Sequence, residues 1–127
     1  FIEIDEEAVW DLEKNLEKLN YDNYEIIIGD VTDFNENVDV TFTNPPFGTR
    51  QKGVDKKFIL QAQKVSEVVY SMHKTSTLEY IRTQIKEPFK ITHEWDYKYP
   101  LKKRYEHHKK KVEHINTTII RYIKHPN

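Results

Sequence analysis

One stretch of this 127-residue chain decides how it folds: Asp39-Val40-Thr41-Phe42-Thr43-Asn44-Pro45-Pro46-Phe47-Gly48-Thr49. Apolar and polar residues alternate up to Asn44, which predicts a strand. Pro45 and Pro46 have fixed φ angles and no backbone N–H, so strand pairing must stop there. The sequence therefore predicts a stiff turn at the carboxyl end of a strand, where an amide side chain, an unpaired carbonyl and the Phe47 ring lie together.

These three groups suit the exocyclic amine of an adenine, whose lone pair is delocalised into the ring. The Asn44 side-chain oxygen and the Pro45 carbonyl would each accept one amine hydrogen, and Phe47 would stack on the extruded base. Asn-Pro-Pro-Phe resembles the catalytic motif of amino-methyltransferases that use S-adenosylmethionine. The resemblance implies that Asn44, Pro45, Pro46 and Phe47 are catalytic. The alternative is a strand followed by a stiff loop with an exposed Phe.

Composition indicates a folded domain. The charged fraction is 32% and the mean hydropathy is −0.82, yet strand-like apolar runs recur throughout the chain. There is no cysteine, which excludes a disulfide framework and a thiolate metal site within these residues. No long apolar span or signal-peptide pattern occurs, so we expect a cytoplasmic protein that does not contact membranes.

Periodicity along the chain predicts alternating strands and helices. Residues 1–4 form a strand, Asp5 caps a helix that ends near Asn20, and Tyr24–Ile28 is a second strand parallel to the first. A strand is expected at 38–43, followed by a helix near 55–66 with Asp55 as a possible N-cap and by a strand at 68–72. A second helix is expected from a capping box at Ser76–Glu79 to about Glu87. The chain then closes with an antiparallel pair formed by 89–99 and 115–123.

This order is similar to the α/β, Rossmann-like sheet of class I methyltransferases that depend on S-adenosylmethionine, with a C-terminal antiparallel hairpin. In doubly wound sheets ligands bind at the carboxyl ends of the strands. The resemblance implies that Glu3 binds the cofactor ribose, that Asp5 shares or replaces that role, and that Asp30 and the Val31 backbone lie near the cofactor adenine. It also places Asn44 beside the cofactor. The alternatives are a solvated Glu3 and an Asp5 that only caps its helix.

Further motifs narrow the resemblance to one family. They are Asn44–Thr49, the charged loop 50–55, the run Val-Tyr-Ser-Met-His-Lys-Thr-Ser-Thr at 69–77, and His-Lys-Lys-Lys at 108–111. Together they resemble the archaeal and eukaryotic methyltransferase-like family that N6-methylates an adenosine in ribosomal RNA. Asn-Pro-Pro-aromatic is shared with protein-glutamine N5-methyltransferases, so that activity is an alternative. A non-catalytic RNA-binding module with a degenerate methyltransferase fold is another.

One expected motif does not occur in the sequence. The first strand of this fold carries a G-x-G-x-G loop that lets the backbone approach the cofactor. The chain has glycine at 29, 48 and 53 alone and contains no such loop. We therefore expect residues 1–127 to be one methyltransferase domain that lacks its first strand and glycine-rich loop at the N-terminus. Such a chain would bind S-adenosylmethionine weakly and be inactive by itself.

A basic window at 102–111 is the candidate RNA contact, and its one acidic residue is Glu106. Cations in such a run bind phosphates without reading sequence, and an interleaved Tyr105 would stack on a base. The alternative is a solvated hairpin loop. The predicted RNA-binding residues are Lys102, Lys103, Arg104, Tyr105, His108, Lys109, Lys110 and Lys111.

The remaining expectations concern a partner and the histidines. The Tyr24–Ile28 strand would lie at a sheet edge, which is a liability unless covered. The resembled family pairs there with a small zinc-binding activator protein by strand addition. His73 and Lys74 are expected to form walls of the site or an exposed turn, whereas His93 and Trp95 are expected to face the core. No His, Asp or Glu cluster has metal-ligand spacing.

Overall fold

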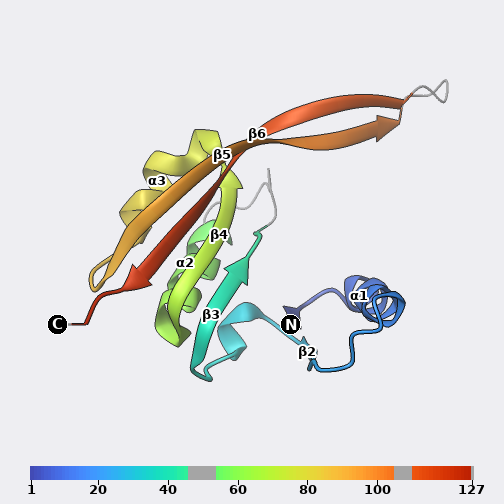
Figure 1. Ribbon diagram of the computed structural model, residues 1–127, viewed down its shortest axis with the longest axis horizontal. Helices are drawn as coiled ribbons and strands as arrows, with labels where there is room; N and C mark the ends of the chain where they lie inside the picture. The colour runs from blue at the N-terminus through green and yellow to red at the C-terminus, as the bar shows by residue number, and fades with distance from the viewer. Residues whose placement is uncertain (46–53, 105–109, 127) are drawn as a thin grey trace. The chain divides into compact units, whose positions relative to one another are not determined.

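The computed structural model describes the backbone of residues 1–45, 54–104 and 110–126, and their side chains outside 101–112. The chain divides into two compact units, Phe1–Glu36 and Asn37–Asn127. The elements follow the order strand, helix, strand, strand, helix, strand, helix, strand, strand (Figure 1). This confirms both the predicted order and the α/β class.

The first unit is built on a parallel pair of short strands, β1 (Ile2–Glu3) and β2 (Ile27–Ile28), joined by α1 (Glu6–Lys18). The Asp5 carboxylate accepts a hydrogen bond from the Glu7 N–H at 2.9 Å, which confirms the predicted N-cap. Asn20 ends the helix with a φ of 53°, a left-handed geometry that Asn adopts more readily than most residues. The second strand is shorter than the predicted Tyr24–Ile28.

A 3₁₀ turn, η1 (Val31–Asp33), follows β2 and is not predicted from the sequence. Asp30 Oδ1 accepts from the Thr32 N–H at 2.9 Å, while Asp33 Oδ2 accepts from the Asp30 N–H at 3.3 Å. The second of these bonds belongs to a reciprocal capping box, in which the Asp30 side chain also accepts from the Asp33 N–H. Asp30 therefore fixes the turn in which it lies.

The second unit is a four-stranded sheet in the order β3-β4-β6-β5. β3 (Val38–Thr43) runs parallel to β4 (Ser66–Lys74), and β6 (Lys110–Lys124) is antiparallel to β4 and to β5 (Phe89–Arg104). The predicted hairpin is confirmed and extends beyond the predicted ends of both strands (Figure 1).

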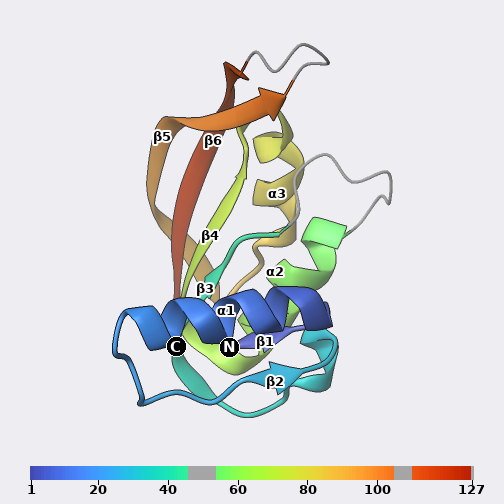
Figure 2. The ribbon, with the colours of Figure 1, turned by 90° about the vertical axis from the view of Figure 1, so that its right-hand side faces the viewer.

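Two helices, α2 (Val54–Val65) and α3 (Leu78–Gln84), pack on one face of this sheet (Figure 2). Burial of apolar surface between helices and sheet is the main stabilising term. The buried residues of α2 include Ile59, Ala62 and Val65. The core cluster consists of Ile59, Ala62, Val69, Leu78, Ile81, Phe89, Ile120 and Tyr122.

Two predicted N-caps are wrong. Asp55 lies inside the first turn of α2 and is not its N-cap. The capping box at Ser76–Glu79 does not form, because a 3₁₀ turn, η2 (Thr75–Thr77), occupies these residues and Thr77 becomes the N-cap of α3. The Thr77 hydroxyl instead donates to the Lys74 carbonyl at 2.8 Å. The helix α3 also ends at Gln84, before the predicted Glu87.

His93 and Trp95 do not face the core, which corrects another expectation. A register shift between Ile91 and His93 in the β5–β6 pair reverses the faces along β5. Phe89 and Ile91 therefore pack on the core side, whereas Trp95 is 45% exposed. The His93 and Trp95 rings stack with centroids 5.1 Å apart on the surface.

Candidate functional site

Asn44 directly follows β3, at the carboxyl end of that strand. Thr43, the last residue of β3, is the register partner of Ser71 in β4. The Asn44 residue is exposed, whereas the Pro45 side chain is fully buried. The buried Pro45 ring holds the chain in place directly after the exposed Asn44 amide. Pro46 and Phe47 lie outside the described residues.

The candidate cofactor residue Glu3 is the last residue of β1, and Asp30 comes shortly after β2. The Gly29 N–H donates to the Glu3 carbonyl at 3.0 Å, so the carboxyl ends of β1 and β2 are adjacent. Glu3 Oε1 accepts from the Asp5 N–H at 3.1 Å, and among the described residues Oε2 has no hydrogen-bond partner. A half-buried carboxylate with one uncommitted oxygen is suited to accept hydrogen bonds from hydroxyl groups.

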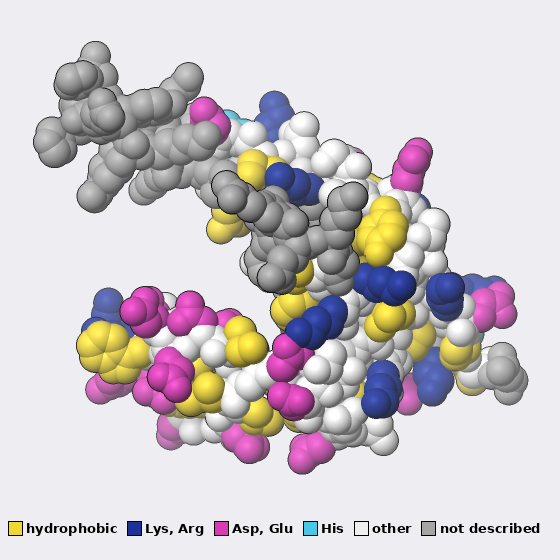
Figure 3. Space-filling view, turned by 180° about the vertical axis from the view of Figure 1, so that it is seen from behind, with side chains coloured by type: hydrophobic (Ala, Val, Ile, Leu, Met, Phe, Trp, Pro, Cys, Tyr) yellow, Lys and Arg dark blue, Asp and Glu magenta, His cyan; other side chains and the backbone are white. Residues whose placement is uncertain are grey.

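Asp5 and Val31 already have structural roles. Asp5 Oδ1 caps α1, and the Val31 carbonyl accepts from the Phe34 N–H at 3.3 Å within η1. Several acidic side chains gather on the face of this unit that Figure 3 shows, and the sequence of α1 is itself rich in Asp and Glu. Each of the two carboxylates predicted for the ribose accepts one backbone N–H, and the bond to the Asp5 carboxylate is the one that caps a helix.

His73 does not form an accessible wall of a site, which corrects the expectation for this residue. It is 1% exposed and lies on β4 facing α2. Its Nε2 is 2.8 Å from Ser71 Oγ, and its Nδ1 is 3.7 Å from Asp55 Oδ2. Burial lowers the pKa of His73 to about 4 and raises the pKa of Asp55. Ser71, His73 and Asp55 are called the buried polar cluster here.

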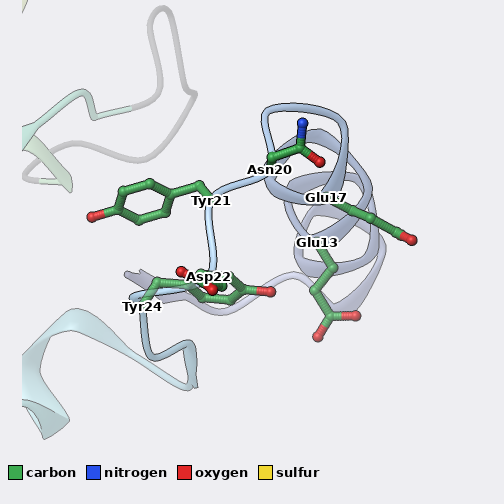
Figure 4. A pocket seen from close by; sticks show the side chains of 6 residues that line it. All are labelled: Glu13, Glu17, Asn20, Tyr21, Asp22 and Tyr24. Atoms are coloured by element: carbon green, nitrogen blue, oxygen red, sulfur yellow. The ribbon is translucent and has the colours of Figure 1, made fainter.

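A separate open pocket of about 830 Å³ lies in the first unit, beside the segment that leads into β2. Figure 4 shows Glu13 and Glu17 on the helix side and Asp22 and Tyr24 on the segment that follows the helix. The Tyr21 and Tyr24 rings stack with centroids 6.2 Å apart. None of the residues that line this pocket was predicted to bind the cofactor.

Comparison with known proteins shows which proteins this chain is similar to. No family model matches the chain. The rRNA N(6)-adenosine-methyltransferase METTL5 of Danio rerio is 32% identical over 128 residues, 94% of this chain and 61% of the relative. The protein MJ0284 of Methanocaldococcus jannaschii is 33% identical over 97% of this chain and 62% of its own length. Nearly the whole of this chain is thus similar to part of a relative that is named rRNA N(6)-adenosine-methyltransferase.

The solved structures agree with this similarity. A candidate RNA methyltransferase of Pyrococcus horikoshii, PH1948, superposes with a TM-score of 0.81 at 37% identity, over 97% of this chain and 61% of that one. A SAM-dependent O-methyltransferase of Thermotoga maritima, at 18% identity and a TM-score of 0.69, shows the fold alone. The fold is thus that of class I methyltransferases. The chain spans about three fifths of the length of the curated relatives it matches.

The RNA-binding prediction falls where side chains are not described. Tyr105, His108 and Lys109 lie outside the described residues. Lys102, Lys103, Arg104, Lys110 and Lys111 are described by backbone alone, as the paired ends of β5 and β6. Residues 1–45, 54–104 and 110–126 contain no helix long and apolar enough to cross a membrane. In the same part of the chain, no group of three or more His, Cys, Asp or Glu could hold a metal ion.

The residues that sequence reasoning missed are Ser71 and Asp55. Alternation along β4 places Val69, Ser71 and His73 on the same face, and Val69 belongs to the core. That pattern was the available signal that His73 is buried beside a hydroxyl. The contact with Asp55 depends on how α2 packs on β4 and has no signal in the sequence.

Proposed function

We propose that this chain carries the adenine-binding part of an enzyme that transfers a methyl group from S-adenosylmethionine to N6 of an adenosine in ribosomal RNA. The observation that carries the proposal is the exposed Asn44 amide at the carboxyl end of β3, next to a buried Pro45, in a class I methyltransferase fold. Curated relatives from three animals that are named for this activity support it.

Asn44 and Pro45 orient the nucleophile in this proposal. The Asn44 side-chain oxygen and the Pro45 carbonyl each accept one N6 hydrogen, which favours a tetrahedral nitrogen with an available lone pair. Phe47 holds the extruded base by stacking. When bound, S-adenosylmethionine supplies an electrophilic methyl group on a sulfonium. With these acceptors in place, the N6 lone pair would be free to take the methyl group, the S–C bond pair would remain on sulfur, and the amine would lose its excess proton to water. Proximity and alignment supply much of the rate.

The cofactor residues of the proposal are Glu3, Asp30 and Val31, with Asp5 as an alternative to Glu3. The uncommitted Glu3 oxygen fits a ribose hydroxyl. Asp30 and the Val31 backbone follow the neighbouring parallel strand, a position suited to the adenine ring. Asp5 remains the weaker candidate because its carboxylate caps α1.

We also propose that a glycine-rich cofactor loop lies outside the 127 residues. None of the three glycines forms a G-x-G-x-G motif. The curated relatives extend well beyond the matched region. The chain alone should therefore bind S-adenosylmethionine weakly, and a micromolar affinity measured by calorimetry would overturn this part.

Two contacts complete the proposal. The basic residues of the β5–β6 hairpin bind RNA phosphates and Tyr105 stacks on a base. The cytoplasm is the compartment in which the protein would bind this RNA.

A small zinc-binding activator adds a strand to the edge at Tyr24–Ile28. Among the described residues β2 pairs with β1 alone, and Tyr24 and Ile28 are 40% and 58% exposed. Ile28→Pro removes a backbone N–H from this edge and should abolish co-purification with such an activator.

The test of the activity uses a chimera in which this chain replaces the matching part of PH1948. Transfer of labelled methyl groups to ribosomal RNA is measured, together with cofactor affinity. Asn44→Ala should abolish transfer and leave cofactor affinity within about twofold, because the amide contacts the substrate base. Asn15→Ala, an exposed Asn on α1, is the matched control and should be fully active. Turnover by the Asn44→Ala chimera would mean that the motif is structural.

A further inference from the structure

The open edge of β2 has backbone groups that point away from β1. The Ile27 N–H donates to the Phe1 carbonyl at 2.8 Å, on the β1 side. Because backbone direction alternates along an extended strand, the N–H groups of Ile26 and Ile28 point to the opposite side. Neither of these two groups has a hydrogen-bond partner among the described residues. The edge therefore has free donors for one more strand.

Exposed apolar side chains lie along this edge. Ile28 and Tyr24 are both exposed, and Ile26 is half-buried. The exposed Phe1 ring meets the Tyr24 ring edge-on, with centroids 6.4 Å apart. Free backbone donors beside apolar side chains suit strand addition, in which main-chain hydrogen bonds give affinity and the side chains give specificity.

The charge of the first unit favours a basic polypeptide as the added strand. Residues 1–36 contain 12 Asp and Glu against 2 Lys, a net charge of −10, whereas residues 37–127 contain 18 Lys and Arg against 9 Asp and Glu, a net charge of +9. RNA phosphates would be repelled by the first unit and attracted by the second. A second copy of this chain would bring two acidic surfaces together, which like charges oppose.

The open pocket of the first unit offers a place for a cation next to this edge. Figure 4 shows Glu13 and Glu17 from α1 on one side of it, and Tyr21, Asp22 and Tyr24 on the other. Among the described residues, the three carboxylates have no hydrogen-bond or ion-pair partner. The two Tyr rings stack, and aromatic ring faces attract cations. Carboxylates beside ring faces suit a Lys ammonium or an Arg guanidinium.

The two lysines of the first unit do not neutralise these carboxylates. Lys14 Nζ lies over the Trp10 ring, 3.6 Å from its centroid. Lys18 forms no ion pair within the part of the chain that the structure describes. A cation that balances the pocket must therefore come from a partner.

We propose that the β2 edge binds a basic polypeptide strand, whose backbone pairs with Ile26 and Ile28 and whose flanking Lys or Arg enters the pocket. Tyr24 leads into β2 and also lines the pocket, so the pocket adjoins the amino-terminal end of the edge. This strand pairing rests on the proposed function, in which a partner adds a strand here, and specifies the chemistry of that strand. The two units then bind different ligands, a polypeptide at the first and RNA at the second.

Peptide titration of the nitrogen-15-labelled chain tests the pairing. The probe is a strand of alternating Val and Thr that begins and ends with two Arg, and matched peptides carry Ser or Glu in place of the Arg residues. The Arg peptide should slow hydrogen exchange of the Ile26 and Ile28 amides about tenfold more than that of the Ile27 amide, which is already bonded to β1. It should bind about tenfold more tightly than the Glu peptide and weaken as salt rises. Equal affinities of the three peptides, or no protection of Ile26 and Ile28, would overturn the proposal.

Matched charge variants separate the pocket from the general acidity of the unit. Glu13→Gln with Glu17→Gln removes two charges from the pocket, whereas Glu6→Gln with Asp11→Asn removes two charges from α1 outside it. The first pair should weaken binding of the Arg peptide about tenfold, and the second pair should change it by less than about twofold. Equal weakening would overturn the assignment of the cation to the pocket.

Backbone variants test the added strand directly. Ile28→Pro removes an edge N–H and should abolish peptide binding, whereas Ile28→Thr keeps the N–H and should bind within about threefold of the wild type. Circular dichroism should show that α1 is intact in both variants. Full binding by Ile28→Pro would rule out pairing at this edge.

Two further outcomes separate the strand site from the proposed function. An RNA oligonucleotide that shifts the amide signals of residues 21–28 would overturn the assignment of the polypeptide to the first unit. Methyl transfer by the PH1948 chimera, with no peptide bound by the chain, would remove the strand site alone. Peptide binding by a chimera that transfers no methyl group would support the strand site and remove the proposed function.

Discussion

Acid should destabilise the second unit through His73 by an amount that follows from its burial. The pKa of this imidazole is about 4 in the folded chain, against an ordinary value of 6.5. Between these values the unfolded chain binds a proton that the folded chain does not, so stability falls as the pH drops from 6.5 toward 4. The stability that the neutral His73 imidazole contributes is fully present above pH 6.5. Between pH 7.5 and pH 4.5 the lost stability from this residue is about 2.5 kcal/mol.

Urea unfolding measured at both pH values checks this number. Trp95 lies in the second unit and Trp10 in the first, so a Trp10→Phe background makes the fluorescence specific to the second unit. The chain with His73 should lose about 2.5 kcal/mol more than the His73→Asn chain over this pH range. Asp55, with a raised pKa, acts in the opposite direction in acid and is present in both chains. Equal losses in the two chains would refute a buried, neutral His73.

The other predictions concern the core, a cap, the RNA contact and the cofactor. Ile81→Ala should cost about 3 kcal/mol in urea unfolding because Ile81 is fully buried, whereas Tyr80→Ala, at a 46% exposed neighbour, should cost far less. Asp5→Ala should remove about 1 kcal/mol from α1 by losing the bond to Glu7, and Asp5→Asn should largely preserve helicity in circular dichroism. Replacing Lys109, Lys110 and Lys111 by Ala should weaken RNA binding and lower its salt slope by about 2 to 3, whereas Lys56→Ala with Lys57→Ala on α2 should leave the slope unchanged. Glu3→Gln in the PH1948 chimera should raise the dissociation constant for S-adenosylmethionine without changing RNA affinity, and an unchanged cofactor affinity would remove Glu3 from the site.

Local signals predicted the parts of the fold that depend on neighbours in the chain. The Asp5 cap, the Asn20 helix end and the alternation along 38–43 were read correctly because each depends on interactions within one turn or one strand. The predicted cap at Ser76 failed because Thr77 bonds back to Lys74 and a 3₁₀ turn replaces the first helical turn. His93 and Trp95 were placed on the wrong face because a register shift is a property of the strand pair.

The sequence by itself determined the order of the elements, the α/β class, the parallel first pair, the C-terminal hairpin and the position of Asn44 after a strand. These follow from periodicity, proline geometry and capping, which act over a few residues. Tertiary structure alone decided that His73 is buried and that Ser71 and Asp55 flank its ring. His73 Nδ1 and Asp55 Oδ2 lie 3.7 Å apart because α2 packs on β4, and no pattern within a few residues of the sequence predicts that distance.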